Sequence, residues 1–571
     1  MMKKYIQYAL VSMLSVLMWA CSSDESGDGV QTRDGKVVLG KAVTFHVNFA
    51  GYNATQEVGT RATAANSVVA QKATVLDNGI VAVTTMQRDT TQQAPAAKTR
   101  ALDNGTYTML AYQGGVFKGE VKGHISGGTF AYADNNAMEL QPGTYDFVLI
   151  NDKVTRAGDK ITVKKDDMEQ GLIARTTYTV TATPQHQQVT FEMHPTAVRL
   201  KVRLLGYMNF TLSGSDVGKL SVDAPGQAPT KVEYDMANNT WATVTTSTDG
   251  YPKTLTFPTA TQDGVTYSST CTDYVYYLPG AQVNQHLQVG NLSIYDRATT
   301  YSYWDIKQKM AASVEPGTSY LLTIKFMMPA YYLMSDGTVG KTSETTAAGG
   351  TKTPIGVVLS RSKHLAIALE DAGKGAKFKW YKEATVQVMA NSAINLGMQP
   401  SDYVLMTSDY DGYHYTWEDC GFGFDVPTRK GDNKTDFPAF YAAGHYGDEL
   451  AAKVTLTNGM ENKKWYLPAV GELCYVYSVL GKGNVNDLIF TGQSYAYNDK
   501  LVTSVFTQVG GGTMVEAYSL TAGYWGSSEC SAPYLSTSNY PYGGYVQFLG
   551  ELNYGYMEKE KDYKVRACVK Y

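Results

Sequence analysis

Two stretches of this chain, LQPGTYDFVLI at residues 140–150 and VEPGTSYLLTI at residues 314–324, share one design. In each of them a Pro-Gly-Thr turn leads into a run in which apolar side chains alternate with others. Such alternation is typical of a strand with one buried face. The alternating residues are Tyr145, Phe147 and Leu149 in the first stretch and Tyr320, Leu322 and Ile324 in the second. Because the two stretches close two successive runs of strands, they predict two β-domains of similar plan in tandem.

The size and composition agree with a large β-rich protein. At 571 residues the chain is too long for a single hydrophobic core and is expected to hold about three domains. It contains 54 glycines and 43 tyrosines, and only 18% of its residues are charged, which favours an extracellular β-rich protein over a helical cytosolic enzyme. The formal net charge is −4 and no block of lysine and arginine occurs, so we expect no nucleic-acid partner.

The N-terminus carries an export signal. Two lysines precede an apolar run at residues 5–20 that is too short for a comfortable membrane span and has the position of a signal peptide. The run ends in LMWAC, which resembles a lipobox, although Leu17 lies one place further upstream than the usual pattern. We therefore expect a signal peptide at 1–20, a lipid on Cys21 and a polar acidic tether at 21–38. The alternative is an ordinary signal peptide followed by a chance cysteine.

The first β-domain is predicted at residues 39–190 and the second at 191–329. The first domain opens with a strand in which apolar residues alternate with polar ones: Val43, Phe45, Val47 and Phe49. A polar segment rich in Gly, Ala and Thr follows, GYNATQEVGTRATAANS, and it predicts an exposed loop around Arg61. The second domain opens with FEMHPTAVRLKVRLLG, in which apolar residues again alternate.

Several of these features together resemble the fimbrillin family over residues 39–329. They are the export signal, the alternating first strand, the TRA loop, the PGTYDFVL strand, and a second domain that opens FEMHPTA and closes PGTSYLLTIKF. Fimbrillins are pilus subunits and related adhesins of Gram-negative anaerobes. The resemblance implies two tandem transthyretin-like β-sandwiches. It also implies that an arginine-specific protease cuts the exported precursor after its first strand. Loss of that strand leaves a groove with an open sheet edge. The donor strand of the next subunit then fills the groove by pairing with this edge.

Carried onto this sequence, the resemblance implies a cut after Arg61 in GTRAT. The removable strand would consist of Val43, Phe45, Val47 and Phe49. Arg33 in QTRDG precedes that strand, so a cut there would not open the groove. The alternative is that Arg61 is a solvated loop residue and that the first strand stays in place.

The composition changes near residue 330, and 24 of the 43 tyrosines lie beyond it. Within this last third, the stretch KKWYLPAVGELCYVYSVLGKG departs from the strand pattern. Its apolar residues have helical spacing and would share one buried face: Val470, Leu473, Cys474, Tyr477 and Leu480. Pro468 near the start and Gly481 just past the end are typical of helix boundaries. The stretch therefore predicts one helix with Cys474 turned toward the core.

The order SDYDGYHYT, WYLPAVGEL, YWGSSE, YVQF and a final VRACV resembles a C-type-lectin-like domain. The variant is the one shared by formylglycine-generating enzymes and many bacterial surface proteins. The resemblance implies an α+β domain at residues 330–571. In such folds the terminal strand lies near the helices, which implies a disulfide between Cys474 and Cys568 and a second between Cys420 and Cys530. Four cysteines allow three pairings, so the connectivity stays open.

No pattern in the chain predicts catalysis, a metal site or a cofactor. The calcium-binding tripeptide of sugar-binding lectins is interrupted here by Ser401 in QPSD, and SDYDG lacks the rest of a calcium loop, although its two carboxylates leave a structural ion open. The chain has 8 histidines and no cluster suited to acid–base or nucleophilic work. Cys271 is expected to be a plain buried thiol. We therefore expect a protein that is not an enzyme.

The tyrosine-rich loops after the helix are predicted to contact a ligand, because tyrosines offer flat amphipathic area at low entropy cost. The candidate contacts are Tyr518, Trp525, Tyr534, Tyr540, Tyr542 and Tyr545, of which Trp525 could equally belong to the core. A whole domain follows the second sandwich where a fimbrillin would end in its own donor strand. We therefore expect an outer-membrane surface lipoprotein that acts as the tip subunit of a fimbria. Its partners would be other subunits, joined by strand addition, and a carbohydrate or protein ligand. The alternative is an anchored glycan-binding lipoprotein that does not polymerise.

Overall fold

The computed structural model describes residues 35–571, apart from 53–67, 77, 90–104, 134–136, 159, 183–186, 213–217, 223–227, 237–238, 248–252, 280–283, 290–291, 299–303, 310–314, 386–388, 390, 392–399, 419, 423–425, 520 and 531–540. Four residues with predicted roles lie outside the described residues: Cys21, Arg61, Tyr534 and Tyr540.

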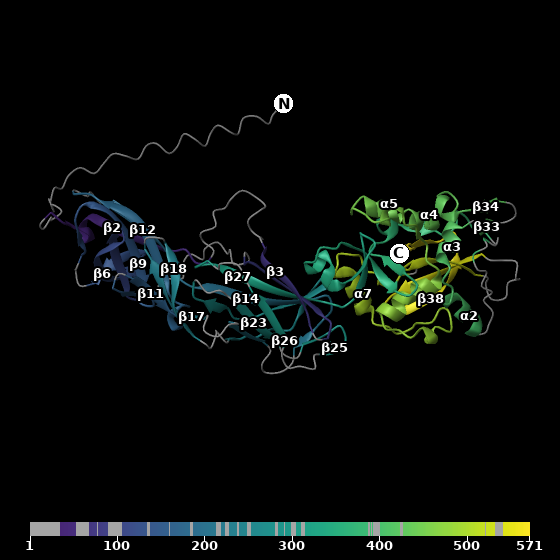
Figure 1. Ribbon diagram of the computed structural model, residues 1–571, viewed down its shortest axis with the longest axis horizontal. Helices are drawn as coiled ribbons and strands as arrows, with labels where there is room; N and C mark the ends of the chain where they lie inside the picture. The colour runs from purple at the N-terminus through teal and green to yellow at the C-terminus, as the bar shows by residue number, and fades with distance from the viewer. Residues whose placement is uncertain are drawn as a thin grey trace, which may run out of the picture.

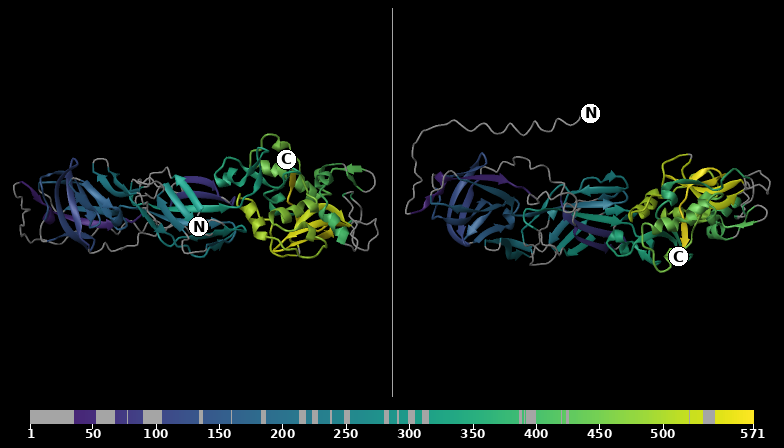
Figure 2. Two further views of the ribbon diagram at one scale, coloured as in Figure 1. Left: turned by 60° about the horizontal axis from the view of Figure 1, so that its bottom comes forward. Right: turned by 90° about the horizontal axis from the view of Figure 1, so that it is seen from above.

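The described chain forms three bodies in a row, with the N-terminal one at one end and the C-terminal one at the other (Figures 1 and 2). We call them the first, second and third body in that order. Strands dominate the regular structure, which confirms the predicted mainly-β fold. Within the described part of the chain, no helix is long and apolar enough to span a membrane.

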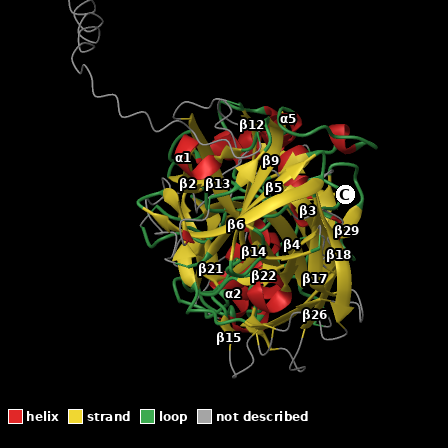
Figure 3. Cartoon of the chain, turned by 90° about the vertical axis from the view of Figure 1, so that its left-hand side faces the viewer, coloured by secondary structure: helices red, strands yellow, loops and turns green. Residues whose placement is uncertain are grey.

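The first body is a closed barrel, seen from its end in Figure 3. In their order around the barrel the strands are β12 (Leu172–Val180), β13 (Gln187–Pro195), β2 (Val43–Phe49), β7 (Thr129–Tyr132), β6 (Val116–Ser126), β5 (Tyr107–Gln113) and β9 (Gly143–Asn151). This differs from the predicted two-sheet sandwich because β2 pairs on both of its sides and so closes the sheet. The smaller elements at its entry are β1 (Val37–Val38), α1 (Leu39–Ala42) and β8 (Glu139–Leu140).

A four-stranded sheet lies against the outside of this barrel. Its strands, in order, are β10 (Thr155–Ala157), β11 (Lys160–Lys164), β17 (Ala228–Asp235) and β18 (Thr240–Ser247). Strand β9 therefore lies between two cores. The predicted alternation of Tyr145, Phe147 and Leu149 is confirmed, since all three are buried inside the barrel. Val148 and Ile150 on the opposite face are buried too, against the outer sheet.

The second body is built around a seven-stranded sheet. Its strands are β20 (Thr261–Asp263), β21 (Thr266–Thr270), β14 (Val198–Gly206), β27 (Ser319–Met327), β4 (Val81–Arg88) and β3 (Val68–Val75), with β22 (Val275–Tyr277) also pairing with β14. A second sheet has the order β19 (Lys253–Thr254), β16 (Gly218–Val222), β23 (Asn284–Val289) and β26 (Trp304–Lys309). A third has the order β15 (Thr211–Leu212), β24 (Leu292–Ile294) and β25 (Arg297–Ala298). The turn before β27 places Gly317 at φ +68°, a conformation that favours glycine.

The first two bodies exchange segments, so the predicted boundary at 190/191 does not divide their sheets. The hairpin of β3 and β4 precedes most of the first body in sequence, yet β4 pairs with β27 of the second body from Val81↔Met327 to Arg88↔Tyr320. Conversely, β17 and β18 lie between β16 and β19 of the second body in sequence but join the outer sheet of the first body. Such pairing between segments distant in sequence leaves no local signal, which is why the pattern of strands along the chain did not reveal it.

The third body combines two sheets with short helices. Its six-stranded sheet has the order β29 (Val339–Lys341), β28 (Tyr331–Met334), β30 (Pro354–Ser360), β31 (Leu365–Ala368), β40 (Cys568–Lys570) and β35 (Trp465–Tyr466). Its five-stranded sheet has the order β32 (Lys377–Lys379), β39 (Asp562–Lys564), β36 (Tyr524–Cys530), β37 (Tyr542–Phe548) and β38 (Leu552–Glu558). The remaining elements are the hairpin β33 (Cys420–Phe422) and β34 (Val426–Thr428), and the helices α2 (Pro400–Thr407), α3 (Gly412–Trp417), α4 (Pro438–Gly444), α5 (Tyr446–Ala451), α6 (Val470–Tyr475) and α7 (Asp499–Thr507).

The helix predicted around Cys474 is confirmed. It comprises α6 and a following π-helical turn at Val476–Leu480. The five residues predicted to share its inner face are all buried: Val470, Leu473, Cys474, Tyr477 and Leu480. The helix begins where the Glu472 carboxylate accepts the Ala469 N–H at 2.9 Å, and Gly481 follows its last turn.

The third body is docked onto the second through α7, which faces the second body in Figure 1. Leu501 of α7 is buried in the core of the second body. The Ser504 hydroxyl donates to the Tyr207 carbonyl oxygen at 2.9 Å. The Gln508 side chain pairs with the Met328 backbone, accepting its N–H at 2.7 Å and donating to its carbonyl at 2.9 Å. These contacts fix the third body on the end of the other two.

Candidate ligand-binding surface of the third body

Trp525, one of the predicted ligand contacts, belongs to the core. Its side chain on β36 is fully buried, and its indole N–H donates to the Phe378 carbonyl oxygen at 2.7 Å. The ring packs edge-on against Tyr563, with 4.9 Å between the ring centroids. A buried indole whose single donor is satisfied has nothing left to offer a ligand. The core interpretation of Trp525 is therefore correct.

The two predicted contacts on β37 are both half-buried but have different neighbours. Tyr545 stacks on the buried Tyr563, with 5.2 Å between centroids and 20° between planes, so much of its ring is used in packing. Tyr542 instead meets the half-buried Tyr556 of β38 edge-on at 5.0 Å.

Tyr542 belongs to a group of four half-buried rings, which we call the aromatic cluster: Tyr403, Phe490, Tyr542 and Tyr556. Tyr403 on α2 and Phe490 lie 5.9 Å apart between centroids. Tyr403, Tyr542 and Tyr556 all pack against the same hydrophobic core, which brings the two ring pairs into one region of the third body. Rings from three elements and one loop thus converge on one surface.

Exposed apolar side chains flank the aromatic cluster. Val404 and Leu405 on α2 are 40% and 56% exposed, and Ile489, next to Phe490, is 39% exposed. Helix α2 lies in the part of the third body away from the second body (Figure 1). Exposed apolar side chains of this kind are common at interaction surfaces.

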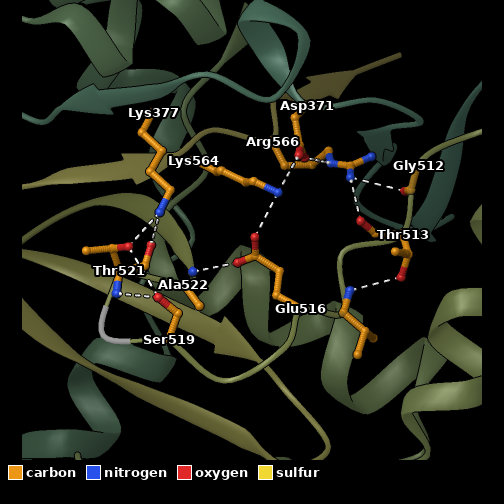
Figure 4. Close-up of polar contacts among 12 residues, drawn as sticks. Asp371, Lys377, Gly512, Thr513, Glu516, Ser519, Thr521, Ala522, Lys564 and Arg566 are labelled. Carbon is orange, nitrogen blue, oxygen red and sulfur yellow. Dashed lines mark hydrogen bonds and ion pairs between the residues drawn. The ribbon is translucent and has the colours of Figure 1, made fainter.

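Tyr518 is the most exposed of the predicted contacts at 80%, and its loop is tied down on both sides (Figure 4). The Lys564 ammonium binds the Glu516 carboxylate at 2.7 Å, and the same carboxylate accepts the Gly523 N–H at 2.7 Å. On the other side of Tyr518, the Lys377 ammonium donates to the backbone carbonyl and the hydroxyl of Thr521 at 2.6 and 2.7 Å. The loop therefore presents Tyr518 from fixed ends.

The start of this loop is held by Arg566, which is almost fully buried. One guanidinium nitrogen donates to the carbonyl oxygens of Gly512 and Thr513 at 3.1 and 3.4 Å, and another forms an ion pair with Asp371 at 2.7 Å (Figure 4). Because Arg566 lies two residues before the terminal strand β40, the C-terminal segment positions the Tyr518 loop.

The structure does not form the disulfides that the resemblance implied. Cys474, Cys530 and Cys568 are buried free thiols, so neither Cys474–Cys568 nor Cys420–Cys530 is formed. Burial raises the pKa of Cys474 to about 12, which keeps the thiol protonated. Tyr466, just before the helix, pairs with Cys568, so the predicted closeness of terminal strand and helix region does hold. The cysteines act as small apolar core residues. Cys271 is also a buried free thiol, as expected.

Asp409, the first carboxylate of SDYDG, has a structural use. The Asp409 carboxylate accepts the Ser528 hydroxyl at 2.7 Å, the Tyr415 hydroxyl at 3.1 Å and the Asp411 N–H at 3.2 Å. These bonds join the start of α3 to β36. Within the described ranges of the chain, no group of three or more His, Cys, Asp or Glu side chains could hold a metal ion.

The predicted removable strand is β2, and it lies inside the first barrel. Val43, Phe45 and Val47 are buried, and the Phe45 ring lies 5.5 Å from Phe147 and 5.8 Å from Phe191. On one side β2 runs parallel to β13 in unbroken register from Val43 to Phe49. On its other side the only residue that pairs with β7 within the described strands is His46. The Val47 N–H also donates to the Gly128 carbonyl oxygen at 2.7 Å, just before β7, so this side of β2 has a shorter ladder than the β13 side.

Sequence reasoning did not identify Tyr403, Phe490 or Tyr556 as surface residues. The alternation of Leu552, Tyr554 and Tyr556 along β38 predicts a buried face, so this pattern indicated the core for Tyr556. Tyr403 and Phe490 carried no such signal, because only the fold brings them together.

Comparison with known proteins leaves the family of this chain open. No protein-family model matches it, and no curated protein matches it in sequence. Among solved structures, it is similar to a candidate cell adhesion protein from Bacteroides uniformis, at 16% identity over 42% of this chain and 88% of that one, with a TM-score of 0.26. A candidate cell adhesion protein from Bacteroides fragilis has 12% identity over 53% and 96% of the two chains, with a TM-score of 0.24. A fimbrial assembly protein from Parabacteroides distasonis has 8% identity over 39% and 86%, with a TM-score of 0.23. Scores this low carry no argument about function.

Proposed function

We propose that this protein is a cell-surface adhesin that binds a glycan through the aromatic cluster of its third body. The observation that carries the proposal is the cluster itself: four half-exposed rings, three of them with hydroxyl groups. Flat rings stack on the apolar faces of sugars, and phenolic hydroxyls can exchange hydrogen bonds with sugar hydroxyls. The elongated arrangement of the three bodies supports a role in which this surface is held away from an anchored N-terminus.

A glycan array tests this proposal with the full-length exported chain. We expect binding by the unaltered protein and at least a tenfold loss, about 1.4 kcal/mol, in the double variant Tyr542→Ala/Tyr556→Ala. The matched control is Tyr331→Ala, which removes an exposed tyrosine of β28 outside the cluster and should leave binding unchanged. Equal binding by the double variant and the unaltered protein would refute the role of the cluster.

Assembly into a fimbria is the second part of the proposal. Removal of β2 would expose Phe147 and Phe191 and leave the edges of β13 and β7 unpaired. The resulting groove would be an acceptor site for a strand from another subunit. The third body occupies the position after the second body where a donor strand would otherwise follow. This favours a tip subunit that accepts a strand and donates none.

N-terminal sequencing of protein from sheared surface filaments tests the assembly. A mature start directly after Arg61, in filaments that contain this chain, is the expected result. A mature start at Cys21, with all of the protein retained in the outer membrane, would instead identify an anchored lipoprotein that does not polymerise. Glycan binding would be unaffected by that outcome, so the two parts of the proposal can fail separately.

A further inference from the structure

Four polar side chains without any exposed surface meet in the core of the third body: Asn391, Lys430, Glu529 and Lys559. They form two close contacts: the Lys559 ammonium forms an ion pair with the Glu529 carboxylate at 2.5 Å, and Lys430 contacts Asn391. The Lys430 Nζ lies 2.6 Å from the Asn391 Oδ1, although the two residues are 39 positions apart in the chain. An amine therefore lies directly against a side-chain carboxamide inside the protein.

Aromatic rings lie near Lys430, while the buried ion pair of Lys559 and Glu529 lies beside Asn391. The Lys430 Nζ lies 5.7 Å from the centroid of the Phe437 ring and 6.0 Å from that of Phe440. Trp380 packs edge-on against Phe440 at 4.8 Å and completes the enclosure. The neutral amine is the nucleophilic form of a lysine side chain.

The carboxamide of Asn391 is held in a fixed orientation. Its Nδ2 donates to the Ser527 carbonyl oxygen at 2.9 Å, while its Oδ1 faces the Lys430 amine. Glu529 lies beside the same residue and accepts the Asn391 backbone N–H at 3.3 Å. Burial raises the pKa of the Glu529 carboxyl, so this group can hold a proton and release it within the enclosed space.

We propose that Lys430 and Asn391 join spontaneously in an intramolecular isopeptide bond. The lone pair of Nζ attacks Cγ of Asn391, the Cγ–Nδ2 bond breaks, and ammonia leaves. One proton passes from the amine to the departing nitrogen, with the Glu529 carboxyl as the carrier. The reaction converts an amine and a primary amide into a secondary amide and ammonia, so it needs no oxidant, reductant or further reagent.

The product would stabilise this region of the third body. A neutral amide would replace a buried amine whose charged form is costly in the core. The bond would also close a covalent loop around α2, α3, β33 and β34, which lie toward the end of the third body distant from the second (Figure 1). A covalent loop restricts the unfolded chain in the way that a disulfide does, without depending on the redox state.

Mass spectrometry of the full-length protein tests the proposal under denaturing and reducing conditions. We expect a mass below that of the sequence by one ammonia molecule. A protease digest should also contain a branched peptide that joins the segments around Asn391 and Lys430. A full mass, with Lys430 found only in linear peptides, would overturn the proposal, and so would a mass deficit located elsewhere.

Variants give matched controls for this measurement. Lys430→Met and Asn391→Ala should each remove the mass deficit and the branched peptide. Lys559→Met removes the other buried lysine of the group but leaves the reacting pair, so the deficit should persist. If a variant fails to fold, the mass of the unaltered protein still decides the question by itself.

Discussion

The buried carboxyl of Glu472 makes the stability of the third body depend on pH. Glu472 lies at the start of α6 and is 2% exposed. It accepts the Tyr466 hydroxyl at 2.7 Å and the Ala469 N–H at 2.9 Å. Burial nevertheless outweighs these bonds and the nearby Lys570 and raises the pKa of Glu472 from 4.5 to about 7, with a smaller contribution from Asp409 in the same direction.

The sign and size of the pH effect follow from the difference between the pKa of Glu472 in the folded and in the unfolded protein. Because the folded-state pKa lies above the unfolded one, the contribution to stability is fully present below pH 4.5 and is lost as the pH rises through about 7. A shift from 4.5 to about 7, at roughly 1.4 kcal/mol for each pH unit, corresponds to a loss of about 3 kcal/mol. That loss is a large fraction of the stability of a typical domain.

Glu472→Gln provides the matched comparison, because the amide has nearly the same shape but does not ionise. We expect the free energy of unfolding of the unaltered protein, relative to Glu472→Gln, to fall by about 3 kcal/mol between about pH 4 and about pH 8. Urea unfolding can be followed by fluorescence of the buried Trp380, Trp465 and Trp525, all in the third body. A difference between the two proteins that stays constant over this pH range would refute the reasoning.

Three further substitutions test other parts of the structure. Trp525→Ala should lower the free energy of unfolding of the third body by about 3–5 kcal/mol, measured by urea unfolding, whereas a ligand-contacting tryptophan at the surface would show little change. Phe45→Ala should weaken the barrel core by a similar amount and speed hydrogen exchange in β13, and unchanged exchange there would contradict the role of β2 in that core. Gln508→Ala leaves the Met328 N–H without its partner at the docking surface, a cost of about 1–3 kcal/mol. Small-angle scattering should then show a more variable angle of the third body, and an unaltered profile would contradict this.

Local sequence patterns predicted those helices and strands whose apolar spacing is complete within one short segment. The helix around Cys474 was predicted because five apolar residues repeat with helical spacing, and strands β9 and β27 because apolar residues alternate after a matched turn. The burial of Trp525 was left open, since a tryptophan in a strand suits a core and a binding surface equally well.

Features that depend on distant segments could not be predicted in this way. Closure of the barrel requires Val43 to pair in parallel with Gln187, and the aromatic cluster requires Tyr403 and Tyr556 to pack against the same core. The Lys430–Asn391 contact is of the same kind: neither residue is unusual in its own stretch of sequence. The expected disulfides rested on a resemblance, and the structure instead uses the cysteines as apolar core residues.

The exchange of segments between the first two bodies has a mechanical consequence. The chain passes between them along five connections: 49–68, 88–107, 195–198, 222–228 and 247–253. A force that pulls the ends of the molecule apart is therefore shared among several covalent links instead of falling on one linker. To separate the bodies, the force must also strip the β3–β4 hairpin from β27, with which β4 pairs, and β17 from β11, each along a whole ladder of hydrogen bonds. The two bodies would thus bear tension as a single unit.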